Sequence, residues 1–119
     1  MSTHVKRAYE PAEPTDGYRV LIDRLWPRGV SKEAAGLDAW AKELAPSPEL
    51  RRWFGHDPER FEEFRLRYRD ELTAQWQALD ELRRRARRGS VTLVYGARDT
   101  EHNGAVVLAE LLTASAAEL

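Results

Sequence analysis

Apolar runs along the chain predict three β-strands. Residues 18–26 read YRVLIDRLW, in which three consecutive apolar residues make both faces apolar, as in a strand at the centre of a sheet. Residues 91–95 form a second strong apolar run, and residues 4–9 form a weaker one. The loop over residues 10–17 is too short for a parallel crossover between adjacent strands, which needs about a dozen residues. The strands at 4–9 and 18–26 are therefore antiparallel neighbours, or they are not neighbours.

The spacing of apolar residues predicts a long helix over residues 57–88. Its apolar positions recur every three or four residues, which gives a helix one apolar face. A single helix of that length would be about 45 Å long, whereas a chain of this size folds to about 35 Å across. We therefore expect a break or bend near Thr73, or an overhanging end. The arginines that end this helix suit its C-terminus, where cations offset the dipole and Gly89 serves as the C-cap.

Helices are also predicted on either side of this segment. Ser47 suits an N-cap, Pro48 suits the first helical position, and Gly55 suits the end of a short helix. A last helix is expected from about residue 100 to about residue 116. Its inward-facing residues are Val107, Leu108, Leu111 and Leu112.

The segment at residues 31–44 is ambiguous. Ser31 could cap a short helix, after which residues 37–44 either continue that helix or form an edge strand. The pattern favours the helix.

This order of elements predicts the fold class. Strand, strand, several helices, strand and helix indicate an α/β fold in one small domain over residues 1–119, with a short, mostly parallel sheet packed by several helices. The chain between residues 18–26 and 91–95 is long enough for a right-handed parallel crossover. We expect these two strands to be adjacent and parallel.

Composition excludes several classes of function. The net charge of -1 gives no reason to expect a nucleic-acid or membrane partner, and no apolar run approaches the roughly 20 residues that span a bilayer. The chain has no cysteine, which excludes disulfides, thiol nucleophiles and thiolate metal sites. A cytoplasmic location is expected, because nothing here needs an oxidising compartment. Composition says nothing about oligomeric state.

Both strong strands become polar at their carboxyl ends. Ligands collect beyond the carboxyl ends of parallel strands in open α/β sheets, so these two polar segments would meet at one site if the strands are adjacent. The candidate residues are Asp23, Arg24, Trp26 and Arg28 after the first strand, and Arg98, Asp99, His102 and Asn103 after the second.

The residue types at this site favour the binding of a small anionic ligand, such as a nucleotide or a phosphorylated metabolite. Arg24, Arg28 and Arg98 would hold the anion, because guanidinium groups match phosphate and carboxylate oxygens. Asp23 or Asp99 would be the general acid or base of an enzyme, with His102 as the alternate. No cofactor is expected, and no metal, because Asp23, Asp99 and His102 lack a metal-binding spacing.

Two of these side chains are expected to be buried. Asp23 lies between Leu21 and Leu25, so its carboxylate needs hydrogen bonds or a cation. Arg28 and Arg98 are the nearest candidates for that cation. Asn103 falls on the buried stripe of the last helix, and we expect its amide to bond to the loop at 23–28 or at 97–99.

Structural roles compete with these functional ones. Asp23 could be half of a buried ion pair, Asp99 or Thr100 could be a helix N-cap, and Trp26 could serve packing. Two other functions stay open. One is a nucleic-acid-associated module that uses Trp26, Trp53 and the arginines of residues 83–88. The other is a non-catalytic scaffold.

Three stretches of the chain resemble a known family. They read KRAYEP with DGYRVLIDRLWPRGVSKE, WAKELAPSPELRRWFGHDPERFEEFRLRYRDEL, and VTLVYGARDTEHNGAVVL. They are similar to the YeaO-like branch of domain-of-unknown-function family 488, over nearly the whole chain. The resemblance implies a bacterial protein and adds no reaction. It places the family's motif positions on Asp23, Arg24, Trp26, Pro27, Arg28, Gly29, Asp99 and Asn103.

The chain departs from the family pattern at two points. Gly104 stands where the family usually has a second asparagine, which leaves any role that needs both amides in doubt. Longer members of the family carry a cysteine in a loop near the last strand, whereas this chain has no cysteine. A thiol mechanism therefore does not carry over.

Overall fold

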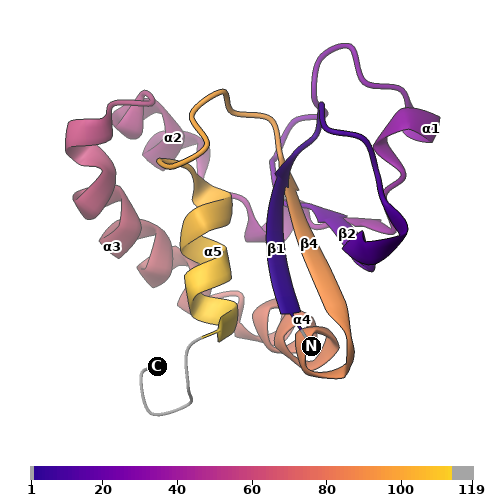
Figure 1. Cartoon of the computed structure of the whole chain (residues 1–119). Coiled ribbons are helices and arrows are strands. Elements are labelled where there is room, and N and C mark those ends of the chain that lie inside the picture. The colour runs from indigo at the N-terminus through magenta and orange to yellow at the C-terminus, as the bar shows by residue number, and fades with distance from the viewer. Residues whose placement is uncertain (1, 114–119) are drawn as a thin grey trace.

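Four parallel strands form one sheet in the computed structural model, which describes residues 2–113 (Figure 1). In spatial order the strands are β1 (Ser2–Arg7), β4 (Ser90–Tyr95), β2 (Tyr18–Leu21) and β3 (Ala39–Trp40). The helices are α1 (Lys32–Ala35), α2 (Pro48–Phe54), α3 (Phe61–Thr73), α4 (Trp76–Arg88) and α5 (Gly104–Thr113), with short 3-10 turns at Pro14–Asp16, Lys42–Leu44 and Pro58–Arg60. The predicted α/β class is confirmed.

The pairing of β2 with β4 agrees with the prediction. The two strands are adjacent and parallel, with Val20 opposite Leu93. On its other side β4 pairs in parallel with β1, so β1 and β2 are not neighbours. This was one of the two arrangements that the short loop between them allowed.

The prediction of a helix over residues 37–44 was wrong. Gly36 ends α1 in the left-handed conformation, and the chain then runs along β2 as the edge strand β3. The backbone N–H groups of Asp38 and Ala41 donate to the carbonyls of Arg19 and Leu21, each at 2.8 Å. Hydrogen bonds to a distant strand thus override the local helical pattern.

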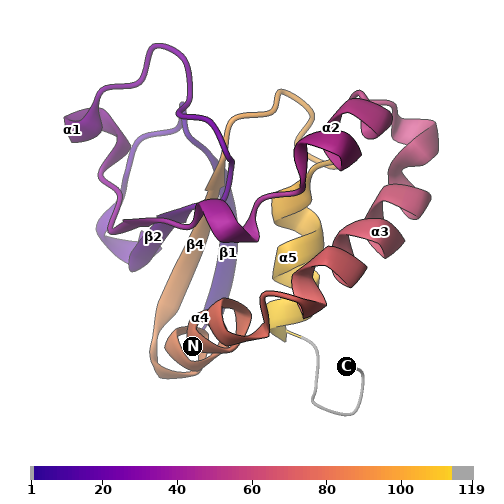
Figure 2. The ribbon, with the colours of Figure 1, turned by 180° about the vertical axis from the view of Figure 1, so that it is seen from behind.

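The long helical segment breaks where the size of the fold requires it. α3 ends at Thr73 and α4 begins at Trp76, and Figure 2 shows the chain changing direction there. The described chain extends 35 × 34 × 21 Å, too short to cover one helix of about 45 Å. Gly89 is the C-cap of α4, as expected.

Helices α2 and α5, on either side of this segment, match the predictions from the sequence to different extents. The Ser47 side chain caps α2 by accepting from the N–H of Leu50, and Gly55 ends that helix. α5 begins at Gly104, four residues later than predicted, and residues 114–116 of the predicted helix lie outside the described residues. None of the helices in the described part is long and apolar enough to cross a membrane.

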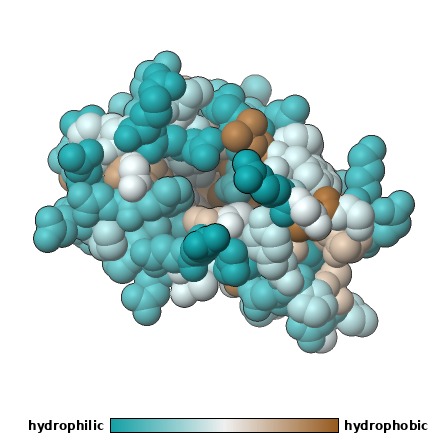
Figure 3. Space-filling model, turned by 90° about the horizontal axis from the view of Figure 1, so that it is seen from above, coloured by the Kyte–Doolittle hydropathy of each residue, from teal (hydrophilic) through white to brown (hydrophobic). Residues whose placement is uncertain are grey.

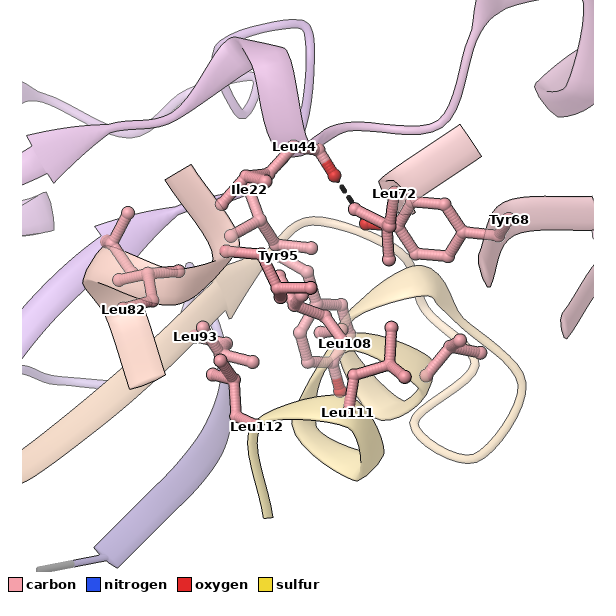
Figure 4. Close-up of a cluster of buried hydrophobic side chains, with 14 of the residues drawn as sticks. Ile22, Leu44, Tyr68, Leu72, Leu82, Leu93, Tyr95, Leu108, Leu111 and Leu112 are labelled. Carbon is pink, nitrogen blue, oxygen red and sulfur yellow. Dashed lines mark hydrogen bonds between the residues drawn. The ribbon is translucent and has the colours of Figure 1, made fainter. Parts of the chain in front are cut away.

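The larger core lies between the sheet and helices α2 to α5. Its fully buried side chains include Phe64, Tyr68, Leu72, Leu93 and Leu108, and Figure 4 shows the Tyr68 hydroxyl donating to the Leu44 carbonyl within it. A smaller cluster of Ala8, Leu21 and Val94 lies apart from it, and Trp26, Val30 and Leu37 pack against that cluster. Apolar side chains on both faces explain why β2 and β4 are central.

A buried ionic cluster joins β1 and β2 to the turn between them. Asp16 pairs with Arg19 at 2.6 Å and with Lys6 at 3.1 Å, and the side chains of Asp16 and Arg19 are almost fully buried. Burial raises the pKa of Asp16, but hydrogen bonds from the Glu13 backbone, Lys6 and Arg19 outweigh it, so the pKa lies below its ordinary value. The folded state therefore favours the ionised carboxylate.

We predict that Asp16→Ala destabilises the fold by about 3–5 kcal/mol, because it leaves the Arg19 guanidinium buried without its carboxylate. Urea unfolding at pH 7 measures this loss. Asp80→Ala is the matched control: it removes the exposed i,i+4 pair with Arg84 and should cost about 1 kcal/mol or less. The contribution of Asp16 should be complete above its ordinary pKa of 3.8 and disappear as the pH falls below it. Equal losses in the two variants would contradict this account.

Candidate functional site

A cleft opens at the carboxyl edge of the sheet. Its volume is about 520 Å³, and it lies between the segment after β2, the segment after β4, and the two ends of α2. Figure 3 looks onto this edge, where hydrophilic side chains surround a hollow. Of the residues predicted from sequence, Asp23, Arg24, Trp26, Arg28 and Asn103 line this cleft.

Asp23 links the segment after β2 to the segment after β4 by a hydrogen bond. Its Oδ2 accepts a hydrogen bond from the backbone N–H of Gly96 at 2.8 Å, and the Trp40 indole donates to its carbonyl at 2.7 Å. The expectation that Arg28 or Arg98 neutralises Asp23 was wrong, since no cation lies within 4 Å of its carboxylate in the described chain. The backbone amide of the neighbouring loop satisfies this carboxylate instead.

Four arginines line the cleft, namely Arg24, Arg28, Arg51 and Arg52. Within residues 2–113 none of them is within ion-pair distance of a carboxylate, and Asp23 is the one acidic side chain among the lining residues described. The Nε of Arg24 is buried and has no hydrogen-bond partner. The cleft therefore carries an excess of positive charge, although the net charge of the chain is -1.

Trp26 combines packing with exposure to the cleft. Its indole N–H donates to the Val30 carbonyl at 2.6 Å, and its ring meets that of Trp40 edge-on with centroids 5.4 Å apart. These contacts hold the ring in place while it lines the cleft.

The three remaining candidates, Arg98, Asp99 and His102, lie outside the lining of the cleft. The Asp99 carboxylate accepts from the N–H groups of Glu101 and His102 and contacts His102 Nδ1 at 2.9 Å. The backbone hydrogen bonds lower the pKa of Asp99 below its ordinary value. Asp99 thus caps the bend before α5 and is not the helix N-cap that its structural alternative proposed, because α5 begins only at Gly104. The His102 ring packs edge-on against Phe61.

Asn103 is buried and hydrogen-bonded, as predicted. Its Nδ2 donates to the carbonyl of Asp99 at 2.9 Å, and its Oδ1 accepts from the N–H of Val106 at 3.0 Å. It therefore caps α5 and is not a member of the helical stripe itself. Gly104 follows at a crowded point, where a Cβ atom would lie 3.3 Å from the ring of Tyr68.

Comparison with known proteins places the chain in a family. Residues 2–119 match DUF488-N3i, described as the inactive DUF488-N3 subclade. The chain belongs to the DUF488-N3i family. It is 45% identical over 112 residues to the uncharacterised protein YeaO of Escherichia coli K12, covering 94% of this chain and 97% of YeaO. It is 48% identical over 108 residues to the uncharacterised protein Rv3073c of Mycobacterium tuberculosis H37Rv, covering 91% of each. The YeaO-like resemblance is confirmed, and no solved structure matches.

Sequence reasoning missed three basic residues of this DUF488-N3i cleft. Arg51 and Arg52 lie on α2, and His56 follows the Gly55 that ends it. His56 has φ 57°, a left-handed conformation that is uncommon for residues other than glycine. The sequence predicts α2 itself, but nothing in it indicates that α2 packs beside the carboxyl edge of the sheet.

No metal site forms from the candidate residues. Within residues 2–113, no three His, Asp or Glu side chains gather in a way that could hold a metal ion.

The environment of Asp23 disfavours its charged form. Burial raises the pKa of Asp23 above its ordinary value, and the Gly96 N–H together with the charges of Arg51 and His56 opposes that shift only in part. The stabilising contribution of Asp23 is therefore complete below the ordinary aspartate pKa of 3.8 and is lost as the pH rises through the raised value. The ionised carboxylate therefore stabilises the fold less than the protonated form does.

We predict that Asp23→Asn costs less than about 1.5 kcal/mol at pH 7, as for an ordinary surface change. An asparagine oxygen can still accept from Gly96, and the disfavoured charge is gone. Asp99→Asn is the contrasting variant, because hydrogen bonds in the fold favour its ionised form. Melting temperatures of both variants at pH 7 check this. A larger loss for Asp23→Asn than for Asp99→Asn would show that Asp23 belongs to a structural network.

Proposed function

We propose that this cleft binds a small phosphate-bearing ligand, a nucleotide or a phosphorylated metabolite, without transforming it. The observation that carries the proposal is the set of four arginines that share the cleft with a single carboxylate. Guanidinium groups match phosphate oxygens in geometry and keep their charge at any physiological pH.

Several arginines elsewhere in the chain are paired with carboxylates, unlike this set. Four of the eight arginines on α3 and α4 pair with carboxylates on the same helix, as in the pairs Arg67–Glu63 and Arg84–Asp80. Within residues 2–113 the cleft arginines have no such partners, so their guanidinium groups repel one another. The buried Nε of Arg24 also lacks a hydrogen bond, which costs free energy. A bound oxyanion would relieve the repulsion between these guanidinium groups.

Binding without turnover fits the rest of the site. Asp99 and His102, the acid–base candidates with a hydrogen bond between them, lie outside the cleft lining. The remaining acid, Asp23, is held by Gly96 at the cleft wall. The family's description as an inactive subclade supports the same reading.

The nucleic-acid alternative has less support. Trp53 lies outside the cleft lining, and Arg60 and Arg67 lie over its ring. Arg84 and Arg85, within the basic stretch at residues 83–88, pair with Asp80 and Glu81. The neutral overall charge adds no attraction for a polyanion. We also propose a cytoplasmic location, because a chain without cysteine needs no oxidising compartment.

We predict that millimolar pyrophosphate or ribose 5-phosphate raises the melting temperature of the wild-type chain. A ligand at 100 times its Kd should stabilise the fold by about 2.7 kcal/mol. The double variant Arg24→Gln, Arg51→Gln should lose this response, whereas Asp23→Asn should strengthen the response to pyrophosphate by removing a competing negative charge. Differential scanning fluorimetry at low ionic strength measures all three.

Arg87→Gln supplies the matched control, because Arg87 is an exposed arginine on α4, away from the cleft. It should respond to the ligands as the wild type does. A wild-type chain that none of the phosphorylated compounds stabilises, or a double variant that responds fully, would refute the proposal.

A further inference from the structure

We infer that the phosphate in this cleft is carried by a flat heteroaromatic ring, so that the ligand is a nucleoside monophosphate. This inference rests on the proposed function and narrows it. It is drawn from three properties of the cleft: its volume, the division of its walls into a basic and an apolar part, and the contacts of Trp26.

The cleft is larger than a simple oxyanion requires. Its volume of about 520 Å³ falls within the range of roughly 300–1,000 Å³ that is typical of sites for whole small molecules. A bare phosphate would contact the arginines and leave the remaining space to water. The ligand therefore has a body as well as an anionic group.

The walls divide into a basic part and an apolar part. The arginines and His56 supply the first part. The second part is formed by Ile22, Pro46, Pro48, Phe54, Phe64 and Tyr95. Most of these apolar residues are buried, so the apolar wall is continuous with the core of the fold. A ligand that fills both parts has a charged end and an apolar body.

Trp26 indicates that this body is flat and aromatic. Cations lie over the rings of Tyr9, Tyr18, Trp40, Trp53 and Phe61. Among the described contacts Trp26 has no cation over its ring, although Arg24 and Arg28 lie two residues away on either side in the chain. Its indole N–H is already bound to Val30, so the ring is held in place before a ligand arrives. Nucleic-acid bases stack on such rings.

A nucleoside monophosphate would also give the Asp23 carboxylate a role in ligand binding. Its Oδ2 accepts from Gly96, whereas its Oδ1 makes no hydrogen bond to the described residues. A carboxylate beside a phosphate only repels it, but a carboxylate beside a sugar hydroxyl or a ring amino group accepts a hydrogen bond from it. The single acid in a basic cleft thus suits a ligand that has donors as well as a phosphate.

The test compares adenosine 5′-monophosphate with ribose 5-phosphate and adenosine, by isothermal titration calorimetry on the full chain at low ionic strength. The monophosphate should bind about tenfold or more tightly than ribose 5-phosphate, as expected for one stacked base. Equal affinities would overturn the inference and leave the proposed anion site standing. Binding of neither phosphate would overturn both, as would adenosine binding as tightly as its monophosphate.

Variants of Trp26 test the stacking itself. Trp26→Leu should abolish the preference for the monophosphate and leave the affinity for ribose 5-phosphate unchanged; a preference that survives would overturn the role of Trp26. Trp26→Phe covers the case in which the leucine variant fails to fold, because it keeps an aromatic ring. It should keep the preference but remove the ligand-induced change in tryptophan fluorescence, which the control Trp53→Phe should retain. A fluorescence change that survives Trp26→Phe would contradict stacking there.

Discussion

The parallel pairing of β2 with β4 is the constraint on which the site depends. Because the two strands run side by side in the same direction, the chain leaves both of them at one edge of the sheet. The pairing continues past the end of β2, where the N–H of Ile22 donates to the carbonyl of Val94 at 3.1 Å. Asp23 then reaches Gly96. Without this register Arg24, Trp26 and Asn103 would not share a cleft.

The second feature of the account is how the chain distributes its charge. Many ionic groups of the described chain are paired close by, either in the buried cluster around Asp16 or in pairs along α3 and α4. The cleft gathers four of the arginines that have no carboxylate partner among the described residues, and they come from two different elements, the segment after β2 and helix α2. Two separate elements that direct unneutralised guanidinium groups into one cleft are more readily explained by an anionic ligand than by the needs of folding.

The sequence predicts those features that depend on local pattern and on chain length. Apolar runs locate β2 and β4, and an overlong apolar stripe predicts the break after Thr73. Asn103 is buried as predicted, but as the N-cap of α5 and not as a member of its apolar stripe. The predictions that failed involve contacts between residues far apart in the sequence. Residues 39–40 form a strand because they can hydrogen-bond to β2. The Asp23 carboxylate bonds to a backbone amide and not to a cation. Arg51 lines the cleft because α2 packs beside the sheet edge. His102 was expected in the cleft, but the Asp99 turn holds it beside Phe61.

The central claim is that the arginines of this cleft are free to bind a phosphate. Two-dimensional NMR of the arginine Nε–H groups, recorded while ribose 5-phosphate is added, tests it most directly because it follows each guanidinium separately. The account predicts saturable shifts for Arg24, Arg28, Arg51 and Arg52, which line the cleft. Arg87 should stay unchanged. Small, unsaturated shifts that are equal for Arg24 and Arg87 would show that the cleft attracts phosphate no more than the rest of the surface does.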